Sequence, residues 1–67
     1  MTREELEQKA IEAELEIHVE WGDIDGLDTL GWRYWLISWE PYTIYEGFDA
    51  SSPLAALQAA AVKAGLV

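Results

Sequence analysis

The chain contains no cysteine, and its 67 residues include only two prolines and four lysine or arginine residues. Without cysteine there is no disulfide framework, no thiol nucleophile and no thiolate metal site, which is typical of a reducing compartment. No apolar run approaches the roughly 18 residues that span a bilayer, and the N-terminus lacks the basic-then-apolar order of a signal peptide. We therefore expect a cytoplasmic protein that does not interact with membranes.

Bases are few while acids are abundant. Thirteen acids against four bases give a net charge of −9, and residues 1–28 carry ten of the acids but only two of the bases. A field of this sign repels the phosphates of nucleic acids and attracts basic proteins. We expect no direct contact with nucleic acid and a basic protein surface as the partner. The alternative is that the charge only keeps the chain soluble.

Motifs for catalysis are also missing. The sequence has no GxGxxG, no P-loop, no HExxH and no nucleophile elbow. The acidic turn at residues 23–28 fails the spacing of a calcium-binding EF-hand: if Gly26 is its sixth position, Trp21 and Trp32 occupy the first and the twelfth. His18 alternates with Glu16 and Glu20 and is expected at the surface. We predict that the protein is not an enzyme and holds no metal or cofactor.

Residue periodicity indicates five elements in the order α-β-β-β-α. Thr2 and Glu5 have the spacing of a capping box, which predicts a helix from residue 3. One stripe of this helix is apolar: Leu6, Ala10 and Ala13. Alternating apolar and polar residues predict a strand over 15–21, and the turn-forming residues of 22–28 predict a loop.

The second half of the chain predicts two more strands and a helix. The segment 31–40 is rich in aromatic and branched residues, and 42–48 follows Pro41 as a strand that pairs back on it. Ser52 and Pro53 are typical of a helix start. We therefore predict one α+β domain over residues 1–67, a three-stranded antiparallel sheet packed against two helices.

The central strand is apolar on both faces. We expect Trp32, Tyr34 and Leu36 to lie against the helices, with Trp21 helping to fill that layer. Two helices of roughly 12 residues can cover one face of such a sheet and hardly both. The remaining side chains, which we predict to form an interface with a second copy or with another protein, are Trp35, Ile37 and Trp39.

The acidic part of the chain supplies the other predicted contacts. These partner-binding residues are Glu5, Glu12, Glu16, Glu20, Asp23, Asp25 and Asp28. A domain of this size is roughly 25 Å across, a length over which B-DNA carries about 15 phosphate charges. The chain could therefore imitate part of a nucleic acid backbone and compete for a basic groove.

The segment from Trp32 to Leu66 resembles small phage and prophage proteins in which a short tryptophan-bearing sheet runs into a helix, an αβα sandwich. The helix start that carries the resemblance is Ser52-Pro53-Leu54-Ala55-Ala56. As a tiny, acidic, cysteine-free chain it is similar to phage-encoded inhibitors of bacterial defence, including anti-CRISPR and anti-restriction proteins. The resemblance implies an inhibitor that binds a host nucleic-acid-binding complex in the host cytoplasm. The alternative is a phage structural or assembly protein that acts through its own oligomer. In either case we expect the chain to form a homo-oligomer, most simply a homodimer.

Overall fold

The computed structural model describes residues 1–23 and 30–67. Its elements are α1 (Arg3–Glu12), β1 (Glu16–Asp23), β2 (Leu30–Trp39), β3 (Tyr42–Asp49) and α2 (Pro53–Lys63). The strands form one antiparallel sheet in the order β1-β2-β3. The predicted α+β fold and its α-β-β-β-α order are confirmed. Two of the predicted partner-binding residues, Asp25 and Asp28, lie outside the described residues.

Both helices begin where their capping residues indicate. The Thr2 hydroxyl accepts a hydrogen bond from the Glu5 amide, and the Glu5 carboxylate accepts one from the Thr2 amide, each at 3.2 Å. The Ser52 hydroxyl accepts from the Ala55 amide at 3.1 Å. These bonds satisfy amides that have no partner inside the helix. The predicted capping box and the second helix start are thus confirmed.

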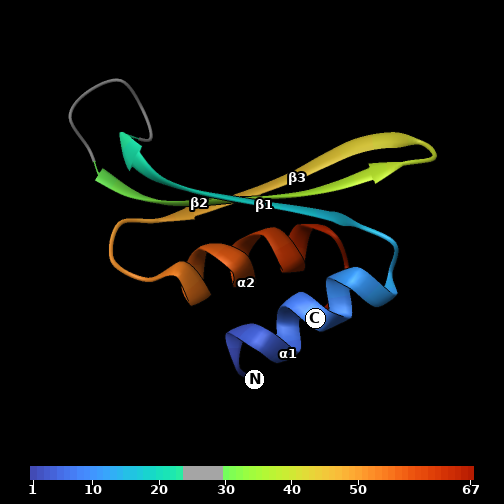
Figure 1. The fold of residues 1–67 in the computed structure, drawn as a ribbon, viewed down its shortest axis with the longest axis horizontal. Coiled ribbons are helices and arrows are strands. Elements are labelled where there is room, and N and C mark those ends of the chain that lie inside the picture. Colours follow the sequence, from blue (N-terminus) through green and yellow to red (C-terminus); the bar gives the residue numbers. More distant parts are fainter. Residues whose placement is uncertain (24–29) are drawn as a thin grey trace.

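Both helices lie on the same side of the sheet, and neither covers the other side (Figure 1). The helix α2 packs against β2 and β3, while α1 contacts α2 and β1. The buried core between the layers consists of Leu6, Ala10, Tyr34, Leu36, Ala56, Leu57, Ala60 and Ala61. The helices α1 and α2 are 10 and 11 residues long, and neither is long and apolar enough to cross a membrane.

Small residues let α2 lie directly on β3. A Cβ atom added to Gly47 would come within 2.3 Å of the Ala56 carbonyl oxygen and 2.4 Å of the Ala60 amide nitrogen. Both neighbours are backbone atoms, so no side-chain rotation could make room. The backbones of β3 and α2 can therefore approach this closely only because residue 47 is glycine.

A buried tyrosine fastens α1 to the sheet. Tyr34 is fully buried, and its hydroxyl accepts a hydrogen bond from Arg3 Nε at 2.6 Å. Arg3 also pairs with Glu7, one turn along the helix, at 3.1 Å. Burial raises the pKa of the Tyr34 hydroxyl, while the hydrogen bond from Arg3 opposes that rise. The contact joins residues 31 positions apart and fixes the first turn of α1.

Three local predictions are corrected. Gly22 and Asp23, expected in the loop, pair with Gly31 and Leu30 at the end of β1, because backbone ladders do not require side-chain alternation. Ala13 is exposed, because α1 ends at Glu12 and Ala13 is its C-cap. Trp21 was expected within the core, but it is 51% exposed and rests against Trp32 with ring centroids 5.1 Å apart.

Candidate functional site

The candidate site is the face of the sheet that the helices leave uncovered, here called the open face. Paired residues of neighbouring strands share a face, so the register fixes its members. From one end to the other, its rows are Glu20-Arg33-Phe48, His18-Trp35-Glu46 and Glu16-Ile37-Ile44, followed by the pair Trp39-Tyr42 beside the β2–β3 hairpin.

The open face is mostly apolar along β2 and β3. Four large side chains expose about half of their surface or more: Trp39 and Tyr42 at 57%, Ile44 at 47% and Phe48 at 59%. The rings of Trp39 and Tyr42 pack edge to face with centroids 4.9 Å apart. Together with the half-buried Trp35 and Ile37, these residues form what we call the apolar strip.

Part of this strip is predictable from the sequence. The predicted interface residues Trp35, Ile37 and Trp39 do lie on the face that the helices leave uncovered. The three members from β3 were not singled out, namely Tyr42, Ile44 and Phe48. The alternation of side chains within 42–48 predicts that these three residues share one face of the strand. Which face it is becomes clear only from the register, which pairs Ile44 with Ile37 and Tyr42 with Trp39.

Polar contacts hold the central ring of the strip. Trp35 Nε1 donates a hydrogen bond to Glu46 Oε2 at 2.8 Å, and the Arg33 guanidinium carbon lies 5.5 Å from the centre of the Trp35 ring. Arg33 Nε is also 3.9 Å from Glu46 Oε1. The cation–π contact and the hydrogen bond together restrict the orientation of the Trp35 ring.

An acidic margin borders the strip along β1. Glu16 and Glu20 lie on the open face with His18 between them, and all three are exposed. His18 Nε2 lies 2.7 Å from Glu16 Oε2. The predicted surface position of His18 is therefore confirmed. Two of the predicted partner-binding carboxylates lie on the open face, Glu16 beside Ile37 and Glu20 beside Arg33.

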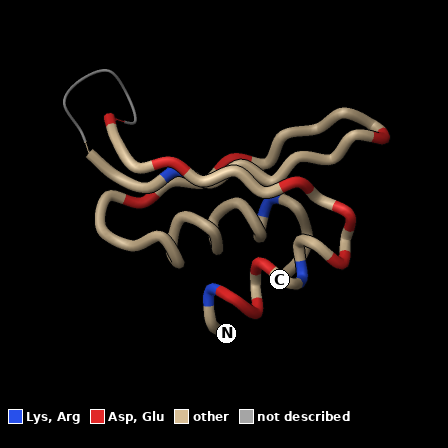
Figure 2. Tube along the Cα trace, in the orientation of Figure 1, with Lys and Arg blue, Asp and Glu red and all other residues tan. Residues whose placement is uncertain are grey.

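The other predicted carboxylates are elsewhere. Glu5 and Glu12 are exposed on α1, on the helical side of the molecule, and Asp23 ends β1. Acidic residues are spread over α1, the corner that follows it and the sheet (Figure 2). Glu5 serves its own helix as well: hydrogen bonds from Thr2 lower the pKa of its carboxyl. Of the described carboxylates that were predicted to bind a partner, Glu16 and Glu20 therefore lie on the open face, while Glu5 and Glu12 lie on the helical side.

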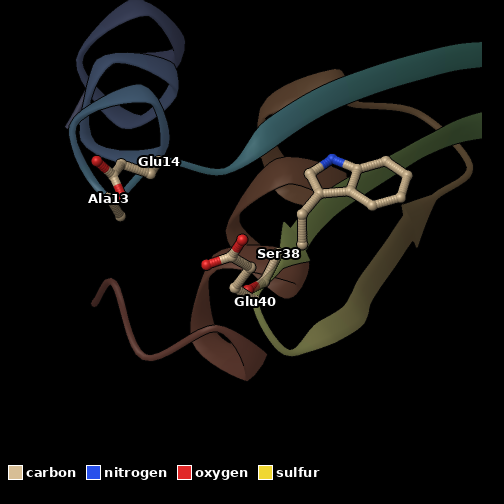
Figure 3. Close-up of a pocket in the computed structure, with 5 residues that line it drawn as sticks. Ala13, Glu14, Ser38 and Glu40 are labelled. Carbon is tan, nitrogen blue, oxygen red and sulfur yellow. The ribbon is translucent and has the colours of Figure 1, made fainter.

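A shallow hollow of about 400 Å³ lies where the α1–β1 corner meets the β2–β3 hairpin (Figure 3). Its lining residues are Ala13, Glu14, Ser38, Trp39 and Glu40. Glu14 comes from the corner and Glu40 from the hairpin, and neither carboxylate has an ion-pair or hydrogen-bond partner among the described residues. Trp39 therefore connects this acidic hollow to the end of the apolar strip.

Within residues 1–23 and 30–67, no group of three or more histidine or acidic side chains is placed to hold a metal ion. Comparison with protein-family models, curated proteins and solved structures finds no match for the chain. The open face thus combines an apolar strip with carboxylates along its β1 margin and at one end.

Proposed function

We propose that this chain is a non-catalytic binding protein that docks through its open face on a basic surface of another protein. By its resemblance to phage inhibitors, the target would be a host nucleic-acid-binding defence complex, which the chain would inhibit by covering its basic site. The observation that carries the proposal is the apolar strip, in which Trp39, Tyr42 and Phe48 each expose more than half of their surface.

The area of the strip supports a docking role. Aromatic side chains have surfaces of roughly 150–250 Å² each, so these three rings expose on the order of 300 Å² in all. Covering that area is worth about 7 kcal/mol at ~25 cal/mol per Å², before the entropy lost on association is subtracted. Apolar patches of this size on single chains often have a function.

Charge supports a basic partner. The net charge of −9 accelerates the approach of a basic protein and opposes that of nucleic acid. Glu16 and Glu20 then stand where they can pair with basic side chains as the rings are covered. In this proposal the rings supply most of the affinity and the charge supplies the rate of association and the selectivity. Imitation of a nucleic acid backbone would be limited to the margin of the open face.

A second candidate is an assembly protein in which another copy of the chain covers the apolar strip. The same exposed rings favour it, because a homodimer would remove them from water. Sedimentation of the purified chain distinguishes the two candidates. The inhibitor needs no self-association, whereas the assembly protein would form dimers or larger species.

The test combines capture with competition. Immobilised wild-type protein is used to retain a nucleic-acid-binding complex from bacterial lysate at several salt concentrations, and the purified complex is then assayed for nucleic acid binding. We expect wild type to displace the nucleic acid and Trp39→Glu to lose this ability. The matched control is Val62→Glu, because Val62 is 62% exposed on α2, away from the open face. Equal competition by both variants, or no basic protein retained even at low salt, would overturn the proposal.

A further inference from the structure

The two halves of the open face differ in chemistry, and this difference restricts what can occupy it. We infer that the occupant is an amphipathic helix of a different protein, an inference that rests on the proposed function. The helix would place an apolar stripe over β2 and β3 and a basic stripe over β1. Three neighbouring features support this inference: the apolar strip, the acidic margin of Glu16 and Glu20, and the hollow between Glu14 and Glu40.

The dimensions of the face fit one helix. Neighbouring strands are about 4.8 Å apart, so the acidic margin on β1 lies about 10 Å from the β3 row, close to the diameter of a helix with its side chains. A helix centred over the strip would hold its flanking side chains above Glu16 and Glu20. The eight residues of β3 span about 26 Å, which matches roughly 17 helical residues.

A second copy fits the face poorly. Two sheets packed face to face in a closed dimer are related by a two-fold axis between them. If the axis follows the strands, the β1 carboxylates of each copy lie over the β3 row of the other, which is apolar except for Glu46. If the axis crosses the strands, carboxylates of β1 face carboxylates of β1. In both arrangements the carboxylates of β1 are desolvated. The basic side chains of the open face, His18 and Arg33, already lie beside Glu16 and Glu46 of their own chain, so a second copy brings few cations to offset its charge of −9.

The hollow extends the same complementarity to one end of the strip. Its two carboxylates, from Glu14 and Glu40, have no ion-pair or hydrogen-bond partner among the described residues, and exposed Trp39 borders them. A lysine or arginine near one end of the docked helix would reach them while the apolar stripe covers Trp39. This contact would set the direction in which the helix lies.

The test uses two synthetic peptides of 18 residues with leucine at the same helical positions. One has lysine at the remaining positions and the other has glutamate. Each is titrated into the uniformly ¹⁵N-labelled full chain at about 0.15 M salt, where charges further apart than about 8 Å are largely screened. We expect the leucine–lysine peptide to shift amide resonances of β1, β2 and β3, and the leucine–glutamate peptide to shift none.

Variants of the protein then test its contacts with the apolar stripe and with the basic stripe of the peptide separately. We expect Trp39→Ser to weaken binding of the leucine–lysine peptide about tenfold, whereas Val62→Ser on α2 leaves it unchanged. The double variant Glu16→Gln and Glu20→Gln should weaken binding at least threefold, and Glu12→Gln on α1 should have no effect. If the glutamine variants of β1 and of α1 weakened peptide binding equally, the attraction would be nonspecific and the inference would be overturned.

The remaining outcomes separate this inference from the proposed function. If both peptides bind the open face equally, the basic stripe is wrong while apolar docking through this face stands. If shifts fall on α1 and α2, or if neither peptide binds, the helical occupant is wrong, and the capture and competition assay still decides the docking role. If the open-face resonances shift with protein concentration alone, a second copy occupies the face and the inference is overturned.

Discussion

The two faces of this sheet are made by alternate residues of the same three strands, yet they differ in how they are covered. On the helical face Tyr34 and Leu36 are fully buried, whereas on the open face Trp39 and Tyr42 each expose 57% of their surface. The helical face is packed with small residues, so α2 lies almost directly on β3 at Gly47. Burial is therefore concentrated on the helical face, and large side chains of the open face remain exposed.

The largest difference between the two faces is expected when one side chain is shortened on each. We expect Leu36→Ala to lower the free energy of unfolding by about 3 kcal/mol, because a fully buried leucine leaves a cavity. Ile44→Ala on the open face should cost about 1 kcal/mol or less. Urea denaturation followed by circular dichroism measures both, and similar losses would contradict the division between the faces.

A second prediction concerns the close contact of α2 and β3. We expect Gly47→Ala to destabilise the protein by about 2 kcal/mol, because its Cβ would meet backbone atoms that can move only with the whole helix. Gly22→Ala is the matched control, since nothing lies within 4 Å of a Cβ at that position. Thermal unfolding of the two variants would refute the close packing if their melting temperatures were the same.

A third prediction uses the buried hydroxyl of the helical face. Tyr34→Phe should cost about 1 kcal/mol, through the lost hydrogen bond from Arg3. Since burial raises the pKa of Tyr34 above its ordinary value of 10.0, its stabilising contribution is complete below pH 10 and is lost as the pH rises through the folded-state pKa. The variant should therefore lose less stability than wild type in alkaline titrations of unfolding. An unchanged alkaline profile would mean that Tyr34 is not the titrating group.

The smallest effect is expected at the turn that leads into α2. Asp49 Oδ2 accepts hydrogen bonds from the amides of Ser51 and Ser52, which lower the pKa of its carboxyl below 3.8. Its contribution to stability is present above that ordinary value and is lost as the pH falls through the folded-state pKa. Asp49→Asn should therefore reduce the loss of stability in acid. Circular dichroism of wild type and variant between pH 5 and about 2 measures this difference. Coinciding acid-unfolding profiles would contradict the prediction.

Much of the fold could be predicted because its signals are local. The capping residues Thr2 and Ser52 fixed where the helices begin, and alternation within β2 separated Tyr34 and Leu36 from Trp35 and Ile37. The end of β1 could not be predicted, because the pairing of Gly22 with Gly31 is a backbone contact that side-chain patterns do not reveal.

The candidate site was predictable only in part, because it depends on register and on distance. Ile44 and Tyr42 join the apolar strip through their pairing with Ile37 and Trp39, which a single strand pattern cannot specify. The acids were grouped by their proximity in sequence, yet Glu12 and Glu16 lie on different layers, since the chain passes from α1 into the sheet between them.

The most direct measurement compares stability and binding in one variant of the open face. For Ile44→Glu, the free energy of unfolding and the dissociation constant of the leucine–lysine peptide would be determined on the same preparation. We expect unfolding to change by about 1 kcal/mol or less and binding to weaken at least tenfold, because Ile44 is half exposed in the centre of the apolar strip. A loss of about 3 kcal/mol or more in stability, with unchanged affinity of the folded fraction, would show that Ile44 belongs to the core and contradict a docking role for the open face.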